Sequence, residues 1–293
     1  MKNEKLIIVF IVFANLTFGQ INGIVADFAT KQPIPYVNIW IENSTYGTSS
    51  NLKGYFEIKK EQIKLDFIVF SAVGYNREKI NAISLTDTFF LKAQISEISE
   101  IIISANKKKK EKIIGELKRQ FPSNRIGCGK TPYMSARFIP YKKEYEETPF
   151  LKSIEFLTHS NIKNAKFSIR FYVADNNNKP KQYLTNKNII GIAKKGARKT
   201  KIDLTLYNIY FPKKGIYVAI EWLIIEENKH IYNYTIKGSS KKYNDGIEYL
   251  PSFSAIIIED KSNVWEYNKG KWEHPFKFND LYYLLQMEIT LTN

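Results

Sequence analysis

The fold is decided by residues 23–75, which run GIVADFATKQPIPYVNIWIENSTYGTSSNLKGYFEIKKEQIKLDFIVFSAVGY. In this stretch Val37, Ile39 and Ile41 alternate with Asn38, Trp40 and Glu42, the period-two pattern of a strand with one buried face. Further on, Gly54 supplies a turn conformation that a residue with a Cβ adopts only at a cost. The stretch therefore predicts a small β-sandwich built from short strands joined by tight turns.

These residues resemble the carboxypeptidase-regulatory-like domain, a transthyretin-like β-sandwich found at the N-terminus of TonB-dependent receptors and in other exported bacterial proteins. The matching features are Gly23-x-Val25-x-Asp27, Pro33-Ile34, Gly47-Thr48, the run from Ser50 to Phe56 and the run from Phe70 to Tyr75. Asn51 stands where the family usually has Asp, and both side chains cap turns. The resemblance implies a fold and an exported setting. It implies no activity, because the family is named after an accessory module of carboxypeptidases.

The N-terminus has the pattern of a cleavable export signal over residues 1–19. Lys2 and Lys5 precede an apolar run of about ten residues, and small residues, Thr17 and Gly19, occupy the −3 and −1 positions before Gln20. The apolar run is too short for a membrane span. We therefore expect a mature chain that begins at Gln20, has no transmembrane segment, and resides in the periplasm, at the outer membrane or on the cell surface.

The formal net charge of +15 raises the question of nucleic-acid binding. The basic residues are 38 Lys and only 6 Arg, whereas recognition of bases and phosphates depends largely on the bidentate guanidinium group. Lysine is also spread along the whole chain. The composition thus favours a solvated basic surface and argues against nucleic acid as a partner, and an envelope protein or a glycan is the expected partner.

A basic linker is predicted to separate two domains. A run of charges at 107–112 is followed by Ile113, Ile114, Leu117 and Phe121, which are spaced for one face of a short helix. The expected organisation is a signal peptide at 1–19, a β-sandwich at 20–104, a linker with a short helix at 105–122, and a larger, jelly-roll-like β-sandwich at 123–293. The fold class is all-β.

One strand of the second domain is predicted to be central in its sheet. Alternate residues from Ile216 to Ile224 form one apolar face, and Glu221 is the only charge on the other. A strand that is apolar on both faces is typically covered on both sides. We therefore expect this strand to lie in the middle of a sandwich sheet.

The candidate binding residues are three aromatic side chains near the C-terminus. Trp265 and Tyr267 share a strand face, and Trp272 follows a turn at 268–270. A hairpin of this kind can present a flat platform on which a sugar ring stacks. Large aromatic residues are also the usual filling of a sandwich core. The core interpretation is favoured, and carbohydrate binding is the alternative.

The sequence offers little that points to catalysis, to a metal site or to a cofactor. His159, His230 and His274 are isolated and begin no zinc-ligand pattern, and no nucleophile elbow occurs. Cys128 is the only cysteine, so an internal disulfide is impossible, and we expect an inert thiol. Residues 124–131 end like a phosphate-binding loop but begin with Asn where the motif requires Gly, so a surface loop is expected. The function predicted is that of a non-catalytic, exported binding or structural protein of the bacterial cell envelope.

Overall fold

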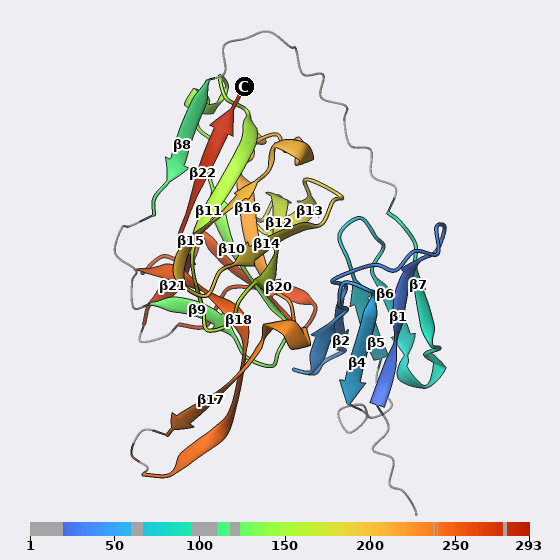
Figure 1. The fold of residues 1–293 in the computed structure, drawn as a ribbon. Coiled ribbons are helices and arrows are strands. Elements are labelled where there is room, and N and C mark those ends of the chain that lie inside the picture. The colour runs from blue at the N-terminus through green and yellow to red at the C-terminus, as the bar shows by residue number, and fades with distance from the viewer. Residues whose placement is uncertain are drawn as a thin grey trace, which may run out of the picture.

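The computed structural model describes residues 20–59, 67–94, 110–117, 124–236, 238, 240–277 and 280–293. Two β-sandwich bodies lie side by side (Figure 1), so the predicted all-β class is confirmed. The expected signal peptide and residues 105–109 and 118–122 of the expected linker lie outside the described residues. Among the residues that are described, no helix has the length and apolarity needed to cross a membrane.

The N-terminal domain consists of two small sheets, with strand orders β4-β1-β7 and β3-β2-β5-β6. Its elements are β1 (Gln20–Asp27), β2 (Asn38–Ile41), β3 (Gly47–Ser49), β4 (Tyr55–Lys59), β5 (Phe67–Ser71), β6 (Glu78–Asn81), the 3-10 helix η2 (Ala82–Ser84) and β7 (Thr88–Leu91). Between the sheets, Ile39, Phe56 and Phe70 are buried, and the ring of Phe70 stacks on Phe89 at 4.2 Å. Gly54 has φ +73°, as its place in the turn predicted.

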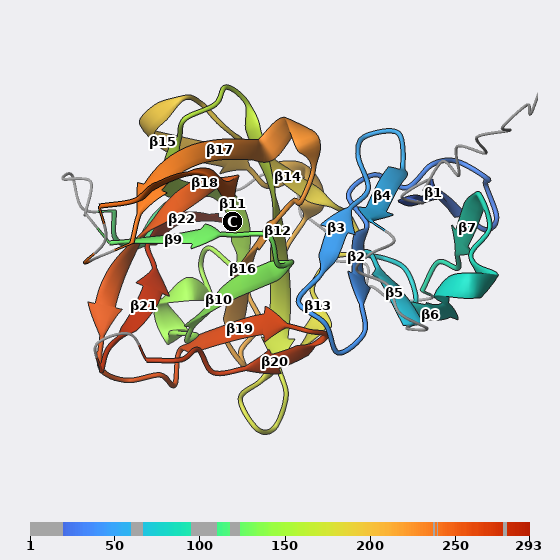
Figure 2. The ribbon, with the colours of Figure 1, turned by 90° about the horizontal axis from the view of Figure 1, so that it is seen from below.

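The C-terminal domain is a larger sandwich of a seven-stranded and an eight-stranded sheet (Figure 2). The seven-stranded sheet contains β10 (Tyr133–Ile139), β12 (Ala165–Ala174), β13 (Pro180–Tyr183), β14 (Ile189–Ala193), β16 (Ile216–Trp222), β19 (Val264–Asn268) and β20 (Lys271–Glu273). The eight-stranded sheet contains β8 (Glu111–Gly115), β9 (Arg125–Cys128), β11 (Phe150–Ser160), β15 (Gly196–Asp203), β17 (Lys229–Thr235), β18 (Lys242–Ile258), β21 (Tyr282–Leu285) and β22 (Met287–Thr292). Three short 3-10 helices join strands: η3 (Lys143–Tyr145), η4 (Thr205–Tyr207) and η5 (Glu226–Asn228).

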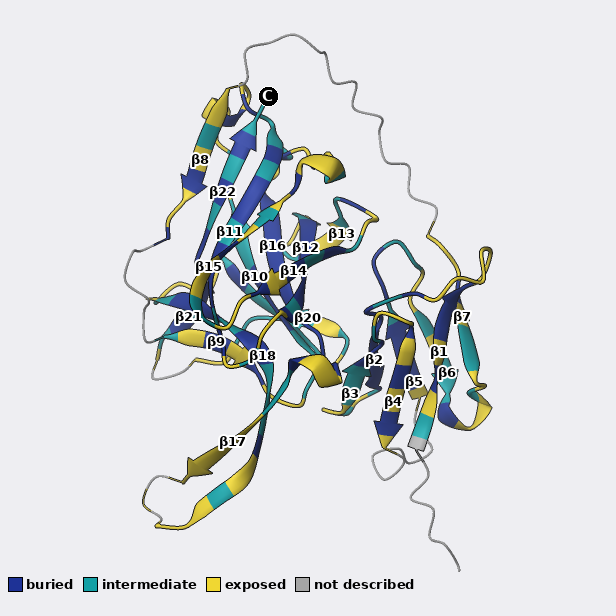
Figure 3. Ribbon diagram, in the orientation of Figure 1, coloured by how far each residue is buried: buried dark blue, intermediate teal, exposed yellow. Residues whose placement is uncertain are grey.

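The core of this sandwich is aromatic. Phe167 packs edge-to-face on Phe253 with ring centroids 4.8 Å apart, and Phe253 makes a similar contact with Trp222 at 5.5 Å. Strand β16 lies between β12 and β10, and all of its residues are buried (Figure 3). The prediction of a central strand covered on both faces is therefore confirmed.

Two local predictions are wrong. Glu111–Gly115 does not start a short helix but forms β8, which pairs with β22. Ile114 is buried while its neighbour Ile113 is 63 % exposed, a strand alternation, because pairing with the edge of a sheet outweighs a weak helical spacing. Likewise, Arg125–Cys128 is not a surface loop but strand β9, paired with β18. Strand β8 extends the C-terminal domain upstream of residue 123.

The two domains are joined by hydrogen bonds of β2 and β3 and by apolar contacts such as that of Tyr36 with Leu223. The backbone N–H of Ser49 donates to the carbonyl of Ile224 at 3.1 Å, and the N–H of Ile224 donates to Ser49 Oγ at 3.0 Å. A Cβ on Gly47 would lie 2.6 Å from the carbonyl oxygen of Ile39 and would collide with Pro132 of the other domain. Only glycine therefore allows this close approach.

The face of β2 that points away from its own core is also buried. Ile39 and Ile41 face the core as predicted, but Asn38 and Trp40 are only 6 % and 4 % exposed. The indole of Trp40 packs edge-to-face on Tyr267 of β19 at 6.3 Å. The expectation of one buried face is thus wrong for this strand, because the C-terminal domain covers the second face.

Candidate functional site

The candidate site is built on the outer face of the seven-stranded sheet, where the N-terminal domain meets it. Alternate residues of a strand point to the same face, so Arg170 and Tyr172 of β12 lie on the side of the sheet that carries Glu221 of β16. Tyr267 of β19 and Trp272 of β20 are cross-strand partners further along this sheet. The same sheet therefore has an apolar inner face and a polar, aromatic outer face.

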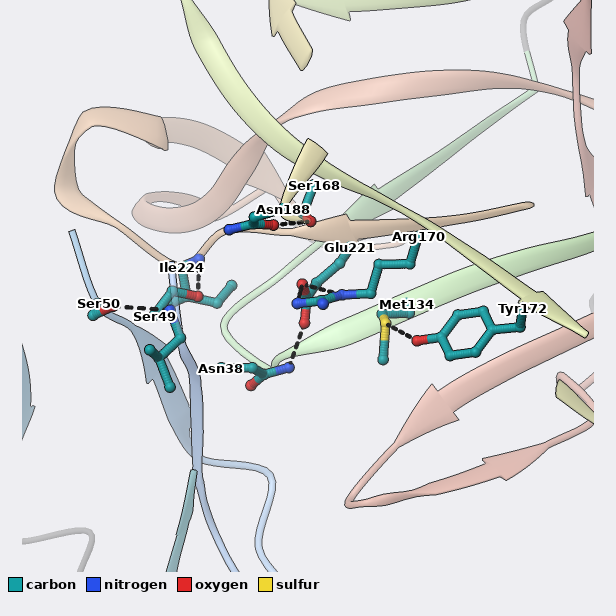
Figure 4. Close-up of polar contacts among 11 residues, drawn as sticks. Asn38, Ser49, Ser50, Met134, Ser168, Arg170, Tyr172, Asn188, Glu221 and Ile224 are labelled. Atoms are coloured by element: carbon teal, nitrogen blue, oxygen red, sulfur yellow. Dashed lines mark hydrogen bonds and ion pairs between the residues drawn. The ribbon is translucent and has the colours of Figure 1, made fainter. Parts of the chain in front are cut away.

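A buried ion pair stands at the centre of this outer face (Figure 4). Arg170 Nε donates to Glu221 Oε2 at 2.7 Å, and Arg170 Nη2 makes a second, shorter contact with the same oxygen. Both side chains are 2 % exposed. Burial disfavours the charged guanidinium, but the attraction of Glu221, Tyr183 and Tyr172 outweighs it and raises the pKa of Arg170.

The N-terminal domain completes the pair from the opposite side. Asn38 Nδ2, on β2, donates to Glu221 Oε1 at 2.8 Å. Two atoms of this cluster, Arg170 Nη1 and Asn38 Oδ1, are buried and have no hydrogen-bond partner among the described residues. A buried polar atom without a partner typically costs about 1–3 kcal/mol. One unsatisfied donor and one unsatisfied acceptor therefore belong to the same cluster.

These residues line an interdomain cleft of about 280 Å³. Ordinary ligand pockets have volumes of about 300–1,000 Å³, so the cleft suits a small ligand such as one sugar ring. The walls are aromatic and are formed by Tyr75, Tyr172, Tyr183, Tyr267 and Trp272. Polar and charged side chains in the lining include Asn38, Arg77, Lys181 and the Arg170–Glu221 pair.

The cleft carries excess positive charge. Arg77, Arg170 and Lys181 line it, and Glu221, which Arg170 neutralises, is the one acid among the described lining residues. The guanidinium of Arg77 lies over the ring of Trp40 at 4.7 Å, and its Nη1 donates to the carbonyl of Gly270 at 3.1 Å. Arg77 and Lys181 therefore have no acidic counterpart within the lining.

The three aromatic residues singled out from the sequence do not act as one platform. Tyr267 and Trp272 line the cleft and pack edge-to-face on each other at 5.2 Å. Trp265 is not among the lining residues, and its ring lies 4.0 Å from that of His274. Burial raises the pKa of Tyr267 to about 12, so its hydroxyl stays protonated at neutral pH. The structure thus brings two of the three residues to the interdomain cleft.

Sequence patterns missed the other half of the site. Arg170 and Lys181 lie on the paired strands β12 and β13 of the C-terminal domain, whereas Asn38 lies on β2 of the N-terminal domain, so only docking of the two domains brings Asn38 to them. One signal was available, namely the lone charge of Glu221 within an apolar strand. A buried carboxylate needs a cationic or hydrogen-bonding partner, so this residue implied a second polar group on the same face.

A second cleft, of about 410 Å³, opens elsewhere along the same interface. Its acidic side chains, Glu57, Glu226 and Glu227, are balanced by three lysines, Lys59, Lys130 and Lys229. None of the described side chains that line it contains a buried polar atom without a hydrogen bond. Among its described lining residues, this cleft therefore has neither the excess charge nor the unpaired buried polar atoms of the first cleft.

The other groups considered for chemistry are engaged elsewhere. Cys128 is buried, and its burial raises the pKa of the thiol, which disfavours the nucleophilic thiolate. His230 Nδ1 lies 2.9 Å from Glu248 Oε1, and His274 Nδ1 lies 2.9 Å from the carbonyl of Val264. Across the described part of the chain, no group of three or more His, Cys, Asp or Glu side chains is placed to hold a metal ion.

Comparison with known families identifies the first domain. Residues 21–103 match the model of the CarboxypepD_reg-like domain. The N-terminal domain is a CarboxypepD_reg-like domain. In this CarboxypepD_reg-like domain the strand that contributes Asn38 to the cleft is β2, which follows the Pro33-Ile34 feature of the sequence. No curated protein matches the chain.

Two solved structures share weak likeness with the whole chain. One is a clostridial cysteine protease after propeptide cleavage, with 13 % identity and a TM-score of 0.37 over 84 % of this chain and 50 % of that chain. The other is the infectious bursal disease virus Gx strain, with 8 % identity and a TM-score of 0.23 over 88 % of this chain and 56 % of that chain. The chain thus spans about half the length of each, and likeness at these TM-scores bears on neither fold nor function.

Proposed function

We propose that this protein is a non-catalytic, exported binding protein of the bacterial cell envelope, and that its ligand occupies the interdomain cleft. The observation that carries the proposal is the Arg170–Glu221–Asn38 cluster, in which a buried donor and a buried acceptor lack partners among the described residues, at a cleft with aromatic walls. Native proteins rarely leave buried polar atoms unpaired, and a bound ligand is one way to satisfy them. The envelope component bound is a protein or a glycan.

The packing of the two domains against each other supports a binding role. The CarboxypepD_reg-like domain packs on the sandwich through β2 and β3, so its β3 edge is not open to strand addition by another chain. It serves instead as one wall of the cleft. A site held between two packed domains is preorganised, which lowers the entropic cost of binding.

Carbohydrate binding is the second candidate, and one observation favours it. Tyr267 and Trp272 both line the cleft, where the apolar face of a sugar ring can contact them. Aromatic walls combined with a few polar groups at the floor are the usual composition of such a site.

A glycan array with matched tryptophan variants tests both candidates. We expect the chain from Gln20 onward to bind array glycans and Trp272→Ala to weaken that binding about tenfold or more, a loss of about 1.4 kcal/mol. Trp265→Ala is the control and should retain binding, since Trp265 does not line the cleft. Equal losses in both variants would contradict a site in the cleft, and no binding to any glycan would leave a protein partner as the proposal.

Export is tested separately. We expect the protein recovered from the envelope or periplasmic fraction of a bacterial host to begin at Gln20, because a basic start and a short apolar run precede that residue. Intact mass spectrometry of the fractionated protein measures this. Full-length protein retained in the cytoplasm would refute the export proposal.

A further inference from the structure

We propose that the ligand of the interdomain cleft is an acidic sugar, one that bears a carboxylate beside ring hydroxyls. This inference rests on the proposed use of the cleft as a ligand site and specifies the chemistry of its occupant. Three properties of the lining lead to it, namely its unpaired polar atoms, its charge and its aromatic walls.

The unpaired atoms require a ligand that both accepts and donates hydrogen bonds. Arg170 Nη1 is a donor and Asn38 Oδ1 is an acceptor, and both are buried at the cleft without partners in the described part of the chain. A sugar hydroxyl can donate to the amide oxygen, while a ring or carboxylate oxygen accepts from the guanidinium. A phosphate dianion fits less well, since its oxygens are acceptors and the lone pairs of Asn38 Oδ1 would repel them.

The charge of the lining selects an anion. Glu221 is fully occupied by Arg170 and by Asn38 Nδ2, so its negative charge is compensated before any ligand enters. Arg77 and Lys181 then leave an excess of positive charge around the cleft. A ligand with one carboxylate is complementary to this field, and a cleft between low-dielectric walls strengthens the attraction.

The aromatic walls restrict the anion to one with an apolar face. Tyr172 is almost fully buried and packs on Tyr183 at 4.7 Å and on Trp272 at 5.3 Å, so it links the two partly exposed rings that form the aromatic surface of the walls. A simple inorganic anion gains nothing from such a surface. The C–H face of a pyranose ring packs against it, and a volume of about 280 Å³ accommodates one such ring.

The test compares an acidic sugar with its methyl ester, which lacks the charge and adds one methyl group. Isothermal titration of the mature protein with galacturonate and with its neutral methyl ester is expected to show about tenfold tighter binding of the acid at low ionic strength. The difference should shrink as salt is added, because exposed charges are screened. Equal affinities for the two probes would overturn the acidic-sugar inference while leaving the cleft as a ligand site.

Two lysine substitutions test whether the charge of the cleft lining causes this difference in affinity. Lys181→Gln should lower the affinity for galacturonate about threefold or more and leave the affinity for the ester unchanged, because Lys181 is an exposed lining residue without a role in the core. Lys195→Gln removes an exposed lysine that does not line the cleft and should change neither affinity. Equal effects of the two substitutions, or failure of both probes to bind, would overturn the inference. The glycan array decides the wider binding proposal independently.

Discussion

Replacement of Glu221 by Gln is expected to lower the free energy of unfolding by about 3–5 kcal/mol, because it leaves the buried guanidinium of Arg170 without a counter-charge. Both partners are 2 % exposed, so water solvates the orphaned cation only poorly. The amide of Gln keeps the volume of the side chain and an oxygen for Asn38 Nδ2. Urea unfolding of the wild type and the variant, followed by tryptophan fluorescence, measures the difference.

A double substitution tests whether the expected loss of stability comes from the unpaired charge of Arg170 or from another cause. Arg170→Met combined with Glu221→Leu removes both charges with side chains of similar size, and buried pairs replaced in this way are often neutral in stability or slightly better. We therefore expect the double variant to be clearly more stable than Glu221→Gln alone. If the double variant were as unstable as Glu221→Gln, packing or domain docking rather than charge pairing would account for the loss.

The second large effect is expected at the domain interface. Trp40→Ala should lower the stability of docking by about 3–5 kcal/mol, the usual cost of truncating a buried aromatic side chain. Trp40 lies outside the core of its own domain and is buried by Tyr267 and Arg77. The CarboxypepD_reg-like domain should therefore stay folded but lose its coupling to the sandwich. In differential scanning calorimetry, the single cooperative transition expected for the wild type should divide into two.

Ile83→Ala provides the matched control for this experiment. Ile83 belongs to the same domain but is 74 % exposed, so its truncation should change stability by no more than about 0.5 kcal/mol. If Trp40→Ala behaved like Ile83→Ala and retained one transition, the interface would carry little of the coupling between the domains. Loss of the N-terminal transition altogether would instead mean that this domain requires its partner in order to fold.

The same interface shows which features of the structure a sequence pattern predicts and which it does not. Alternation in β2 predicted that Ile39 and Ile41 face a core, and they do. The same alternation assigned Asn38 and Trp40 to the opposite face, without the information that another domain covers it. Period-two patterns report the two sides of a strand, but a polar residue on the second side looks the same whether it meets water or a partner domain.

Competition between a short helix and pairing with a sheet edge explains why the segment at 111–115 was misassigned from the sequence. Ile113, Ile114 and Leu117 have a spacing that fits a helix, yet the backbone of Glu111–Gly115 pairs with β22, some 170 residues later in the chain. A free sheet edge offers a complete row of hydrogen bonds, whereas a helix of about two turns is marginal in water. The partner strand lies too far along the sequence for any local pattern to indicate it.

The sequence by itself determined the all-β class, the family of the first domain and the central position of Ile216–Trp222, because each follows from local alternation and turn chemistry. Only the tertiary structure decided that Arg170, Glu221 and Asn38 form one cluster and that Tyr267 and Trp272 reach the cleft while Trp265 does not. The physical reason is that a binding site depends on which faces of distant strands are packed together. That choice is made by the docking of two domains, whose energy is spread over contacts between residues well over a hundred positions apart.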